Sequence, residues 1–261
     1  MRADPPTTRP LRSVALLGAS NIALGLPQLA RALDRAGCRR STFACGHGRS
    51  FGLRSSIPLR TLGALREAPL FDDPEPLDAA LVADVGNDLV YGVESARILA
   101  WVEECLERLS ARGARIVVAG PPLASLARLT PTRYAVAKGA LFPFHALSRD
   151  DALRGIAEID AGLAAISARR GLAYVAPPAR WYGLDPIHVR RACRQEWANG
   201  LVATMLGPDS PPVAAWSTGR WSFADWSRLR LLRPESEVLC GIARRGAGRT
   251  RLSTGLEVRC Q

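Results

Sequence analysis

Short apolar runs bounded by turn residues alternate along the chain with longer stretches of helical periodicity. The helical stretches repeat leucine, isoleucine and alanine every three or four residues, with arginine and glutamate on the opposite face. They cover residues 26–36, 93–112 and 154–170, and the apolar runs cover residues 13–17, 42–45, 79–85, 115–119 and 172–176. Strands that alternate with helices form parallel sheets covered by helices. The pattern predicts an α/β fold, a three-layer α/β/α sandwich with a five-stranded parallel sheet.

Three glycines mark the ends of the predicted helices. Gly37, Gly113 and Gly171 each fall between a helical stretch and the next strand, where glycine readily adopts the left-handed conformation that ends a helix. Residues 121–148 contain prolines, glycines and aromatic residues and interrupt the pattern. We expect them to form an insertion over the C-terminal edge of the sheet, where open α/β sheets bind their ligands.

The character of the chain changes after about Gly207. The stretch that follows alternates apolar and polar residues around glycine-rich turns, without a repeat or a low-complexity tract. A chain of 261 residues can form one main core and a small addition, but it is short for two full domains. We therefore predict a main domain over residues 1–206 and a small β-rich C-terminal appendage over residues 207–261.

The formal net charge is +11, and nearly all of the positive charge comes from arginine, since Lys138 is the only lysine. The arginines are scattered over helical faces and the C-terminal segment, which is typical of a solvated basic surface. Attraction to anionic substrates, nucleic acid or a membrane surface is the alternative. No segment interleaves basic with aromatic residues, so we expect no nucleic-acid partner. No apolar stretch is long enough for a membrane span, and the composition predicts a soluble globular protein.

The cysteines lie far apart and form no C-x-x-C pair, which excludes the usual spacings of zinc sites and thioredoxin-like motifs. They are Cys38, Cys45, Cys105, Cys193, Cys240 and Cys260. We expect free thiols and no metal. The arginines near the N-terminus precede only a short apolar run, which we interpret as a core strand and not as an export signal. We predict a cytoplasmic location; in a secreted protein, Cys240 and Cys260 could form a disulfide.

A serine follows the first predicted strand. Gly18-Ala19-Ser20-Asn21 leads into the first helical stretch. The Ser20 hydroxyl would then lie at the C-terminal edge of the sheet, with its backbone N–H available to a developing oxyanion. Serine and asparagine are also favoured N-cap residues, so a structural cap is the alternative to a nucleophile.

Two further groups of polar residues follow later strands. Gly86-Asn87-Asp88 comes directly after the run at 79–85, so the Asn87 amide can point into the same crevice, although this is also an ordinary turn sequence. Asp185-Pro186-Ile187-His188 follows the fifth strand. The Asp185 carboxylate can accept the Nδ1 hydrogen of His188 and leave Nε2 to take a proton from a serine hydroxyl. Asp185 could instead cap a helix.

These segments and the turn Gly46-His47-Gly48 occur in one order, each at the C-terminal end of a predicted strand. Over residues 12–206 the sequence resembles the SGNH, or GDSL-like, hydrolase superfamily, whose blocks supply a serine, a glycine, an asparagine and an Asp-x-x-His pair. The resemblance implies a flavodoxin-like sandwich with a catalytic triad of Ser20, Asp185 and His188. It also implies an oxyanion hole formed by Ser20, Gly48 and Asn87, with Gly46 as the alternative to Gly48.

The match departs from the family at two positions. Ala19 stands where the family commonly has aspartate, and Ile22 replaces the leucine of the older name. Neither residue is one of the reacting groups. The resemblance therefore implies an SGNH-type serine hydrolase that cleaves a carboxylic ester through an acyl-enzyme, as esterases, lipases and deacetylases do, without a cofactor. The expected partner is a small-molecule, carbohydrate or lipid ester, with the acyl group, the leaving group and the oligomeric state left open.

Two other functions compete with this one. A catalytically silent α/β domain could bind an anionic ligand or partner through the arginine-rich surface, but such a domain does not need the Asp-x-x-His pair. A dinucleotide-binding domain fits less well, because the first turn lacks the G-x-G-x-x-G approach to a pyrophosphate.

Ser50 is a rival nucleophile, because the segment from Gly48 to Gly52 matches the G-x-S-x-G elbow of α/β-hydrolases. Only two predicted strands precede it, and the acid and histidine of that fold usually come from separate loops, so we favour Ser20. His47 could lie at the rim of the site or fill a turn, and His145 lies in the insertion. For Trp181 and Tyr182 we expect core packing, with an apolar substrate pocket as the alternative.

Overall fold

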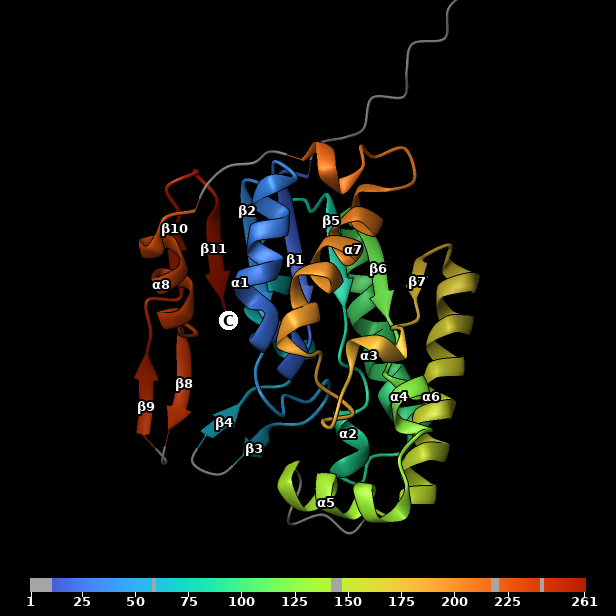
Figure 1. Ribbon diagram of the computed structural model, residues 1–261. Helices are drawn as coiled ribbons and strands as arrows, with labels where there is room; N and C mark the ends of the chain where they lie inside the picture. The colour runs from blue at the N-terminus through green and yellow to red at the C-terminus, as the bar shows by residue number, and fades with distance from the viewer. Residues whose placement is uncertain (1–10, 58–59, 142–146, 217–220, 240–241) are drawn as a thin grey trace, which may run out of the picture.

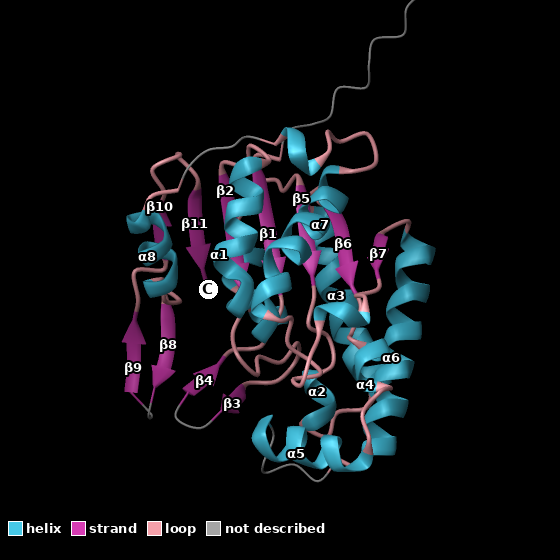
Figure 2. Cartoon of the chain, viewed as in Figure 1, coloured by secondary structure: helices cyan, strands magenta, loops and turns pink. Residues whose placement is uncertain are grey.

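Five parallel strands form the centre of the main sheet in the computed structural model, which describes residues 11–57, 60–141, 147–216, 221–239 and 242–261 (Figures 1 and 2). Each overlaps one of the five apolar runs, so the predicted parallel sheet is confirmed. In spatial order they are β2 (Arg40–Ala44), β1 (Ser13–Leu17), β5 (Ala79–Val82), β6 (Arg115–Ala119) and β7 (Ala173–Val175). The strand order reverses at β1, and the carboxyl ends of strands at such a reversal border the crevice where ligands bind.

Two strands from the end of the chain extend this sheet. β11 (Glu257–Cys260) pairs in parallel with β2, and β10 (Arg249–Arg251) pairs antiparallel with β11. The sheet therefore has seven strands where the apolar runs predicted five. The two additional strands are short and rich in arginine, so they carry no apolar run that a sequence pattern could detect.

A second, antiparallel sheet also combines distant parts of the chain. β8 (Ser236–Leu239) pairs with β4 (Arg60–Leu62), with β3 (Ser55–Ile57) and β9 (Ile242–Arg245) at the two edges. The β-rich segment predicted after residue 207 thus pairs with strands from the first quarter of the chain. Helix α7 (Arg194–Leu206) ends at residue 206, and the division of the chain there into two domains stays a prediction.

Helices cover both faces of the main sheet. α1 (Ser20–Arg35) and α7 pack on one face, and α3 (Ser95–Ala111) and α6 (Arg149–Arg170) pack on the other (Figure 1). Successive side chains of a strand point to opposite faces. In β1, Leu16 accordingly packs into the core beneath α1 and α7, whereas Leu17 packs into the core beneath α3 and α6.

Helix α1 begins at Ser20, earlier than the stretch predicted at 26–36. Gly25 and Pro27 lower the helix propensity of this region, which explains the late predicted start. A Cβ atom at Gly25 would lie only 2.4 Å from the Trp197 ring of α7. Gly25 therefore allows the close packing of α1 on α7, and tertiary packing outweighs its low propensity.

The remaining helices and 3-10 turns lie mostly in the connections. They are α2 (Asn87–Val90), α4 (Leu123–Leu126), α5 (Pro131–Leu141), α8 (Phe223–Leu231), η1 (Leu65–Glu67), η2 (Pro69–Asp72), η3 (Ala179–Trp181), η4 (Arg191–Cys193) and η5 (Val213–Ala215). Gly37, Gly113 and Gly171 have φ angles of +83°, +81° and +64°. The predicted left-handed residues after the helices are confirmed.

The cysteines within the described ranges are free thiols. Cys240 and His145 lie outside the described residues, so the disulfide considered between Cys240 and Cys260 is not described. In the described part of the chain, no helix has the length and apolar character needed to cross a bilayer.

Candidate active site

Ser20 is the first residue of α1 and follows β1 after only two residues. A Cβ atom at Gly18 would lie 2.5 Å from the Ile22 side chain, so the turn requires glycine. The backbone N–H groups of Ala19 and Ile22 donate to Oδ2 of Asp84, at 2.9 and 3.1 Å. This carboxylate fixes the turn, and Ser20 lies at the C-terminal edge of the sheet with 7% of its surface exposed.

A chain of hydrogen bonds links Ser20 to His188 and Asp185. The Oγ of Ser20 lies 2.8 Å from Nε2 of His188, and Nδ1 of His188 lies 2.6 Å from Oδ2 of Asp185. The structure therefore brings the three residues predicted from sequence into contact. This arrangement lets an imidazole accept the serine proton while a carboxylate fixes the ring tautomer.

Asp185 also holds the loop that carries His188. Its Oδ1 accepts hydrogen bonds from the backbone N–H groups of Ile187 and His188, both at 3.1 Å. Burial acts to raise the pKa of Asp185, but the hydrogen bonds and the charge of His188 outweigh burial and lower this pKa below its usual value. Asp185 is therefore ionised at neutral pH.

Asn21 fixes the position of His188 from both sides, a role that the sequence analysis did not assign to it. Its Nδ2 donates to the carbonyl of Ile187 at 2.9 Å, and its Oδ1 accepts from the N–H of Val189 at 2.8 Å. The same Nδ2 donates to Oδ1 of Asp84 at 2.9 Å. The residue next to Ser20 thus connects the histidine loop to the turn of the serine.

Asp84 is the second residue that the sequence analysis missed. The predicted strand at 79–85 included it, but β5 ends at Val82, and Asp84 has a φ angle of +59°, the only positive φ among the described non-glycine residues. Burial raises the pKa of Asp84, and the hydrogen bonds from Asn21, Ile22 and Ala19 oppose this rise. A single aspartate inside the otherwise apolar run at 79–85 is the sequence signal that could have identified this residue.

Asn87 begins helix α2 and lines a cavity together with Ser20. Its side chain forms no hydrogen bond with another described residue, so the amide is available to a ligand. Gly48 lies in the turn after β2, with a φ angle of +65°. Tyr91, directly after α2, donates its hydroxyl to the Gly48 carbonyl at 2.6 Å. The turn of Gly48 and the segment of Asn87 are thus held together.

Ser50 is completely buried. Its hydroxyl donates to Asp88, and it accepts hydrogen bonds from the N–H groups of Gly52 and Leu53, at 3.1 and 2.7 Å. The buried Asp88 carboxylate also accepts from the N–H of Phe51 at 3.1 Å. Ser50 therefore holds a turn in place and has no histidine partner among the described residues.

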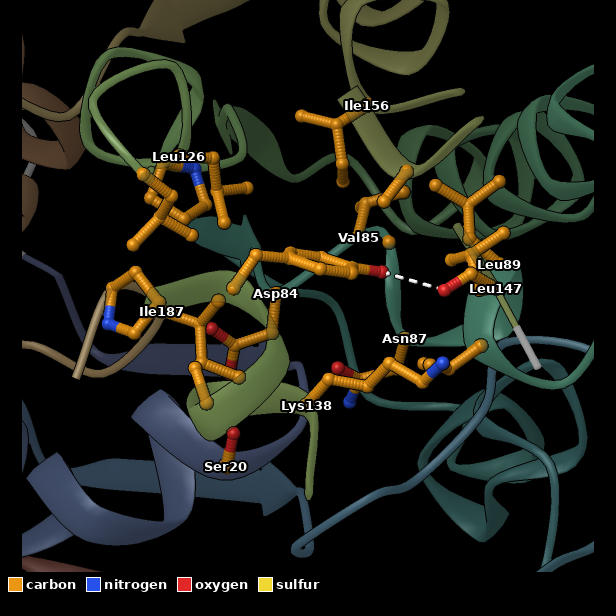
Figure 3. A pocket seen from close by; sticks show the side chains of 18 of the residues that line it. Ser20, Asp84, Val85, Asn87, Leu89, Leu126, Lys138, Leu147, Ile156 and Ile187 are labelled. Atoms are coloured by element: carbon orange, nitrogen blue, oxygen red, sulfur yellow. Dashed lines mark hydrogen bonds between the residues drawn. The ribbon is translucent and has the colours of Figure 1, made fainter. Parts of the chain in front are cut away.

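An apolar cavity of about 130 Å³ opens beside Ser20 (Figure 3). Residues of the insertion form part of its wall, as predicted for 121–148: Leu126 at the end of α4, Leu129 in the segment that follows, Lys138 on α5, and Leu147. Figure 3 shows Ser20 and Asn87 on one side of the cavity and Ile156 on the other. The Tyr134 hydroxyl, which donates to the Leu147 carbonyl at 2.9 Å, closes the insertion on itself.

The remaining candidate residues from the sequence do not contact the Ser20–His188–Asp185 chain of hydrogen bonds by any described hydrogen bond. Trp181 is buried in the core and donates its indole N–H to Glu196, and Tyr182 packs against the same core, which confirms the expected packing. His47 and Gly46 border a second, larger cavity. Within the described ranges, no group of three histidine, cysteine or acidic side chains is placed to hold a metal ion.

No protein-family model and no curated protein sequence matches this chain. The fold is similar to that of an inhibitor-bound aryl esterase from M. smegmatis, with a TM-score of 0.53 and 12% sequence identity over 74% of this chain and 97% of that chain. It is also similar to a protein from Bacteroides fragilis NCTC 9343 described as an acylhydrolase, with a TM-score of 0.52 and 12% identity over 78% and 89% of the two chains. This chain has the fold of the SGNH-type, or GDSL-like, hydrolases.

Proposed function

We propose that this protein is a serine hydrolase that cleaves carboxylic esters through a catalytic triad of Ser20, His188 and Asp185. The observation that carries the proposal is the continuous chain of hydrogen bonds from the Ser20 hydroxyl through His188 to Asp185, at 2.8 and 2.6 Å. An ionised carboxylate, an oriented imidazole and a cavity beside the serine are features that nucleophilic catalysis by serine uses.

The reaction proceeds in two halves. Ser20 Oγ attacks the ester carbonyl carbon while His188 Nε2 takes the hydroxyl proton, and Asp185 stabilises the imidazolium. The tetrahedral intermediate collapses, the C–O bond to the alcohol breaks, and His188 returns the proton to the leaving alcohol. Water then attacks the acyl-enzyme with His188 as general base, which releases the carboxylic acid and restores the Ser20 hydroxyl.

The negative charge of the tetrahedral intermediate needs hydrogen-bond donors. The N–H of Ser20, the N–H of Gly48 and the amide of Asn87 are the proposed donors. Two observations support this assignment. Asn87 lines the cavity with Ser20, and the hydrogen bond from Tyr91 to the Gly48 carbonyl joins the two donor segments. The apolar cavity beside Ser20 is the proposed site of the acyl chain, since its wall is mostly aliphatic.

Covalent labelling with a fluorophosphonate probe, read by intact mass, tests the proposal. We expect one adduct on the wild-type protein and on Ser110→Ala, a matched control whose serine is exposed on α3. We expect no adduct on Ser20→Ala or His188→Ala. An adduct that persists on folded Ser20→Ala protein would refute the assignment of the nucleophile.

The second candidate function is a catalytically silent domain that binds an anionic ligand. An arginine-lined cavity beside the site is the observation that favours it. It predicts binding of anions without any adduct on the wild-type protein. The labelling experiment therefore separates the two functions.

A further inference from the structure

A second cavity, of about 700 Å³, lies between α1, α8, the turn after β2 and the start of α7. Three of the segments that line it also carry residues of the proposed active site. Ala23 and Leu24 follow Ser20 in α1, and His47 precedes Gly48 in its turn. Arg191, three residues after His188, forms another part of the wall. The two cavities therefore meet the same end of α1.

The cavity wall is rich in positive charge. Among the described residues, four arginines and no aspartate or glutamate line it: Arg191, Arg194, Arg230 and Arg233. Other described arginines pair with carboxylates, as Arg170 does with Glu107 and Arg40 with Glu75. The described wall of this cavity offers its arginines no such partner.

Most of these guanidinium groups have no partner within the described part of the chain. Arg191, Arg230 and Arg233 form no side-chain hydrogen bond or ion pair with another described residue. Among the described residues, Arg194 donates only to the neutral carbonyls of Val189 and Leu24, both at 3.2 Å. Burial, together with the nearby charge of Arg191, lowers the pKa of Arg194. An anion in the cavity would relieve this unfavourable clustering of charge.

The wall also offers a polar contact of another kind. Gln28 on α1 lines the cavity, and its buried Oε1 has no hydrogen-bond partner among the described residues. An unpaired buried acceptor costs free energy that a donor from a ligand recovers. A hydroxyl group close to the anionic group would supply such a donor.

We propose that this cavity binds a phosphoryl group. Guanidinium groups bind phosphate oxygens in bidentate pairs, and a doubly charged anion matches several arginines better than a single carboxylate does. The phosphoryl group has two sources. It is either part of the leaving alcohol of an ester whose acyl chain occupies the apolar cavity, which rests on the proposed function, or a free phosphate.

Thermal unfolding with inorganic phosphate tests the site without any reliance on catalysis. At constant ionic strength adjusted with chloride, we expect phosphate to raise the Tm of the wild-type protein and of Arg244→Ala, a control on the exposed strand β9. We expect no rise in the double variant Arg230→Ala/Arg233→Ala, whose two side chains are exposed and remote in sequence from the triad. No rise in the wild type, or an equal rise in the double variant, would overturn the proposal.

Kinetics with a matched pair of substrates identifies the source of the phosphoryl group. If it belongs to the ester, kcat/KM for octanoyl glycerol 3-phosphate exceeds that for octanoyl glycerol by about tenfold or more, since one charge-assisted hydrogen bond is worth at least that factor. The ratio then falls towards one in Arg230→Ala/Arg233→Ala but not in Arg244→Ala, and inorganic phosphate competes with the phosphorylated ester.

The remaining outcomes are also distinct. Equal hydrolysis of both esters, together with the phosphate-dependent rise in Tm, identifies a free phosphate as the ligand and supports the site. Hydrolysis of neither ester, together with the same rise in Tm and no fluorophosphonate adduct, counts against the proposed function but leaves the phosphoryl site standing.

Discussion

Replacement of Asn21 by alanine separates the positioning of His188 from the chemistry itself. The substitution removes the donor to the Ile187 carbonyl, the acceptor of the Val189 N–H and one donor to Asp84, with distances of 2.8 to 2.9 Å. It leaves the three triad residues in place. The direct hydrogen bond left between the histidine loop and the serine turn would then be the one between His188 and Ser20, while Arg194 would still bridge the carbonyls of Val189 and Leu24.

The size of the effect follows from these contacts. A neutral hydrogen bond contributes about 0.5–1.5 kcal/mol net, and one to a charged group about 1.5–3 kcal/mol. Because the site is only partly buried, water replaces some of the lost partners, and we expect a loss of about 2–3 kcal/mol in the free energy of unfolding. Since a misplacement of about 1 Å can cost a hundredfold in rate, we expect kcat/KM to fall by about ten- to a hundredfold.

Urea unfolding, steady-state hydrolysis of an ester that the wild type cleaves and the rate of fluorophosphonate labelling provide the readouts. The labelling rate should fall by the same factor as kcat/KM, because both depend on activation of Ser20 by His188. Asn199→Ala is the matched control, since Asn199 lies on α7 and its side chain pairs with Gln195. A reduced stability with kcat/KM and labelling within twofold of wild type would refute the positioning role of Asn21.

Three further predictions concern other parts of the structure. Asn87→Ala should lower kcat about a hundred- to a thousandfold, the usual cost of one oxyanion donor, without a change in Tm; unchanged turnover would remove Asn87 from the mechanism. Ser50→Ala should lower the free energy of unfolding in urea by about 1–3 kcal/mol, because Asp88 loses a buried hydrogen-bond donor, yet keep its fluorophosphonate adduct; loss of the adduct in folded protein would make Ser50 the nucleophile. Burial acts to raise the pKa of Asp225, but hydrogen bonds from Ser253 and Ser222 outweigh burial and lower it from 3.8 to about 2. The charged form therefore stabilises the fold above about pH 4, and this contribution, about 2 kcal/mol, is lost progressively as the pH falls through the folded-state pKa of about 2. The stability difference between wild type and Asp225→Asn in urea should shrink between pH 6 and pH 2.5, and a constant difference would contradict this reasoning.

The local pattern of the sequence was sufficient to predict the strands and turns that carry the candidate site. Alternation of apolar runs with helical periodicity predicted the five central strands, and the glycines after the helices predicted three left-handed turns. Because the strands are parallel, their carboxyl ends share one edge, so Ser20, Asn87 and the Asp185–His188 pair could be placed together before their contacts were known. These inferences need only periodicity and chain order, which are properties of neighbouring residues.

Contacts between segments that are distant in sequence determine the remaining features of the site and of the sheets. Asn21 meets the carbonyl of Ile187 across 166 positions of sequence, and the positive φ of Asp84 turns a residue from a predicted strand towards the serine turn. β11 completes the main sheet beside β2, and the arginines of the second cavity come from two separate regions of the chain. Ser50 lies in a motif that suggests a nucleophile, but burial against Asp88 makes it structural. Sequence periodicity is local, whereas a hydrogen bond or a shared cavity depends on which elements pack together, and that is decided only when the whole chain folds.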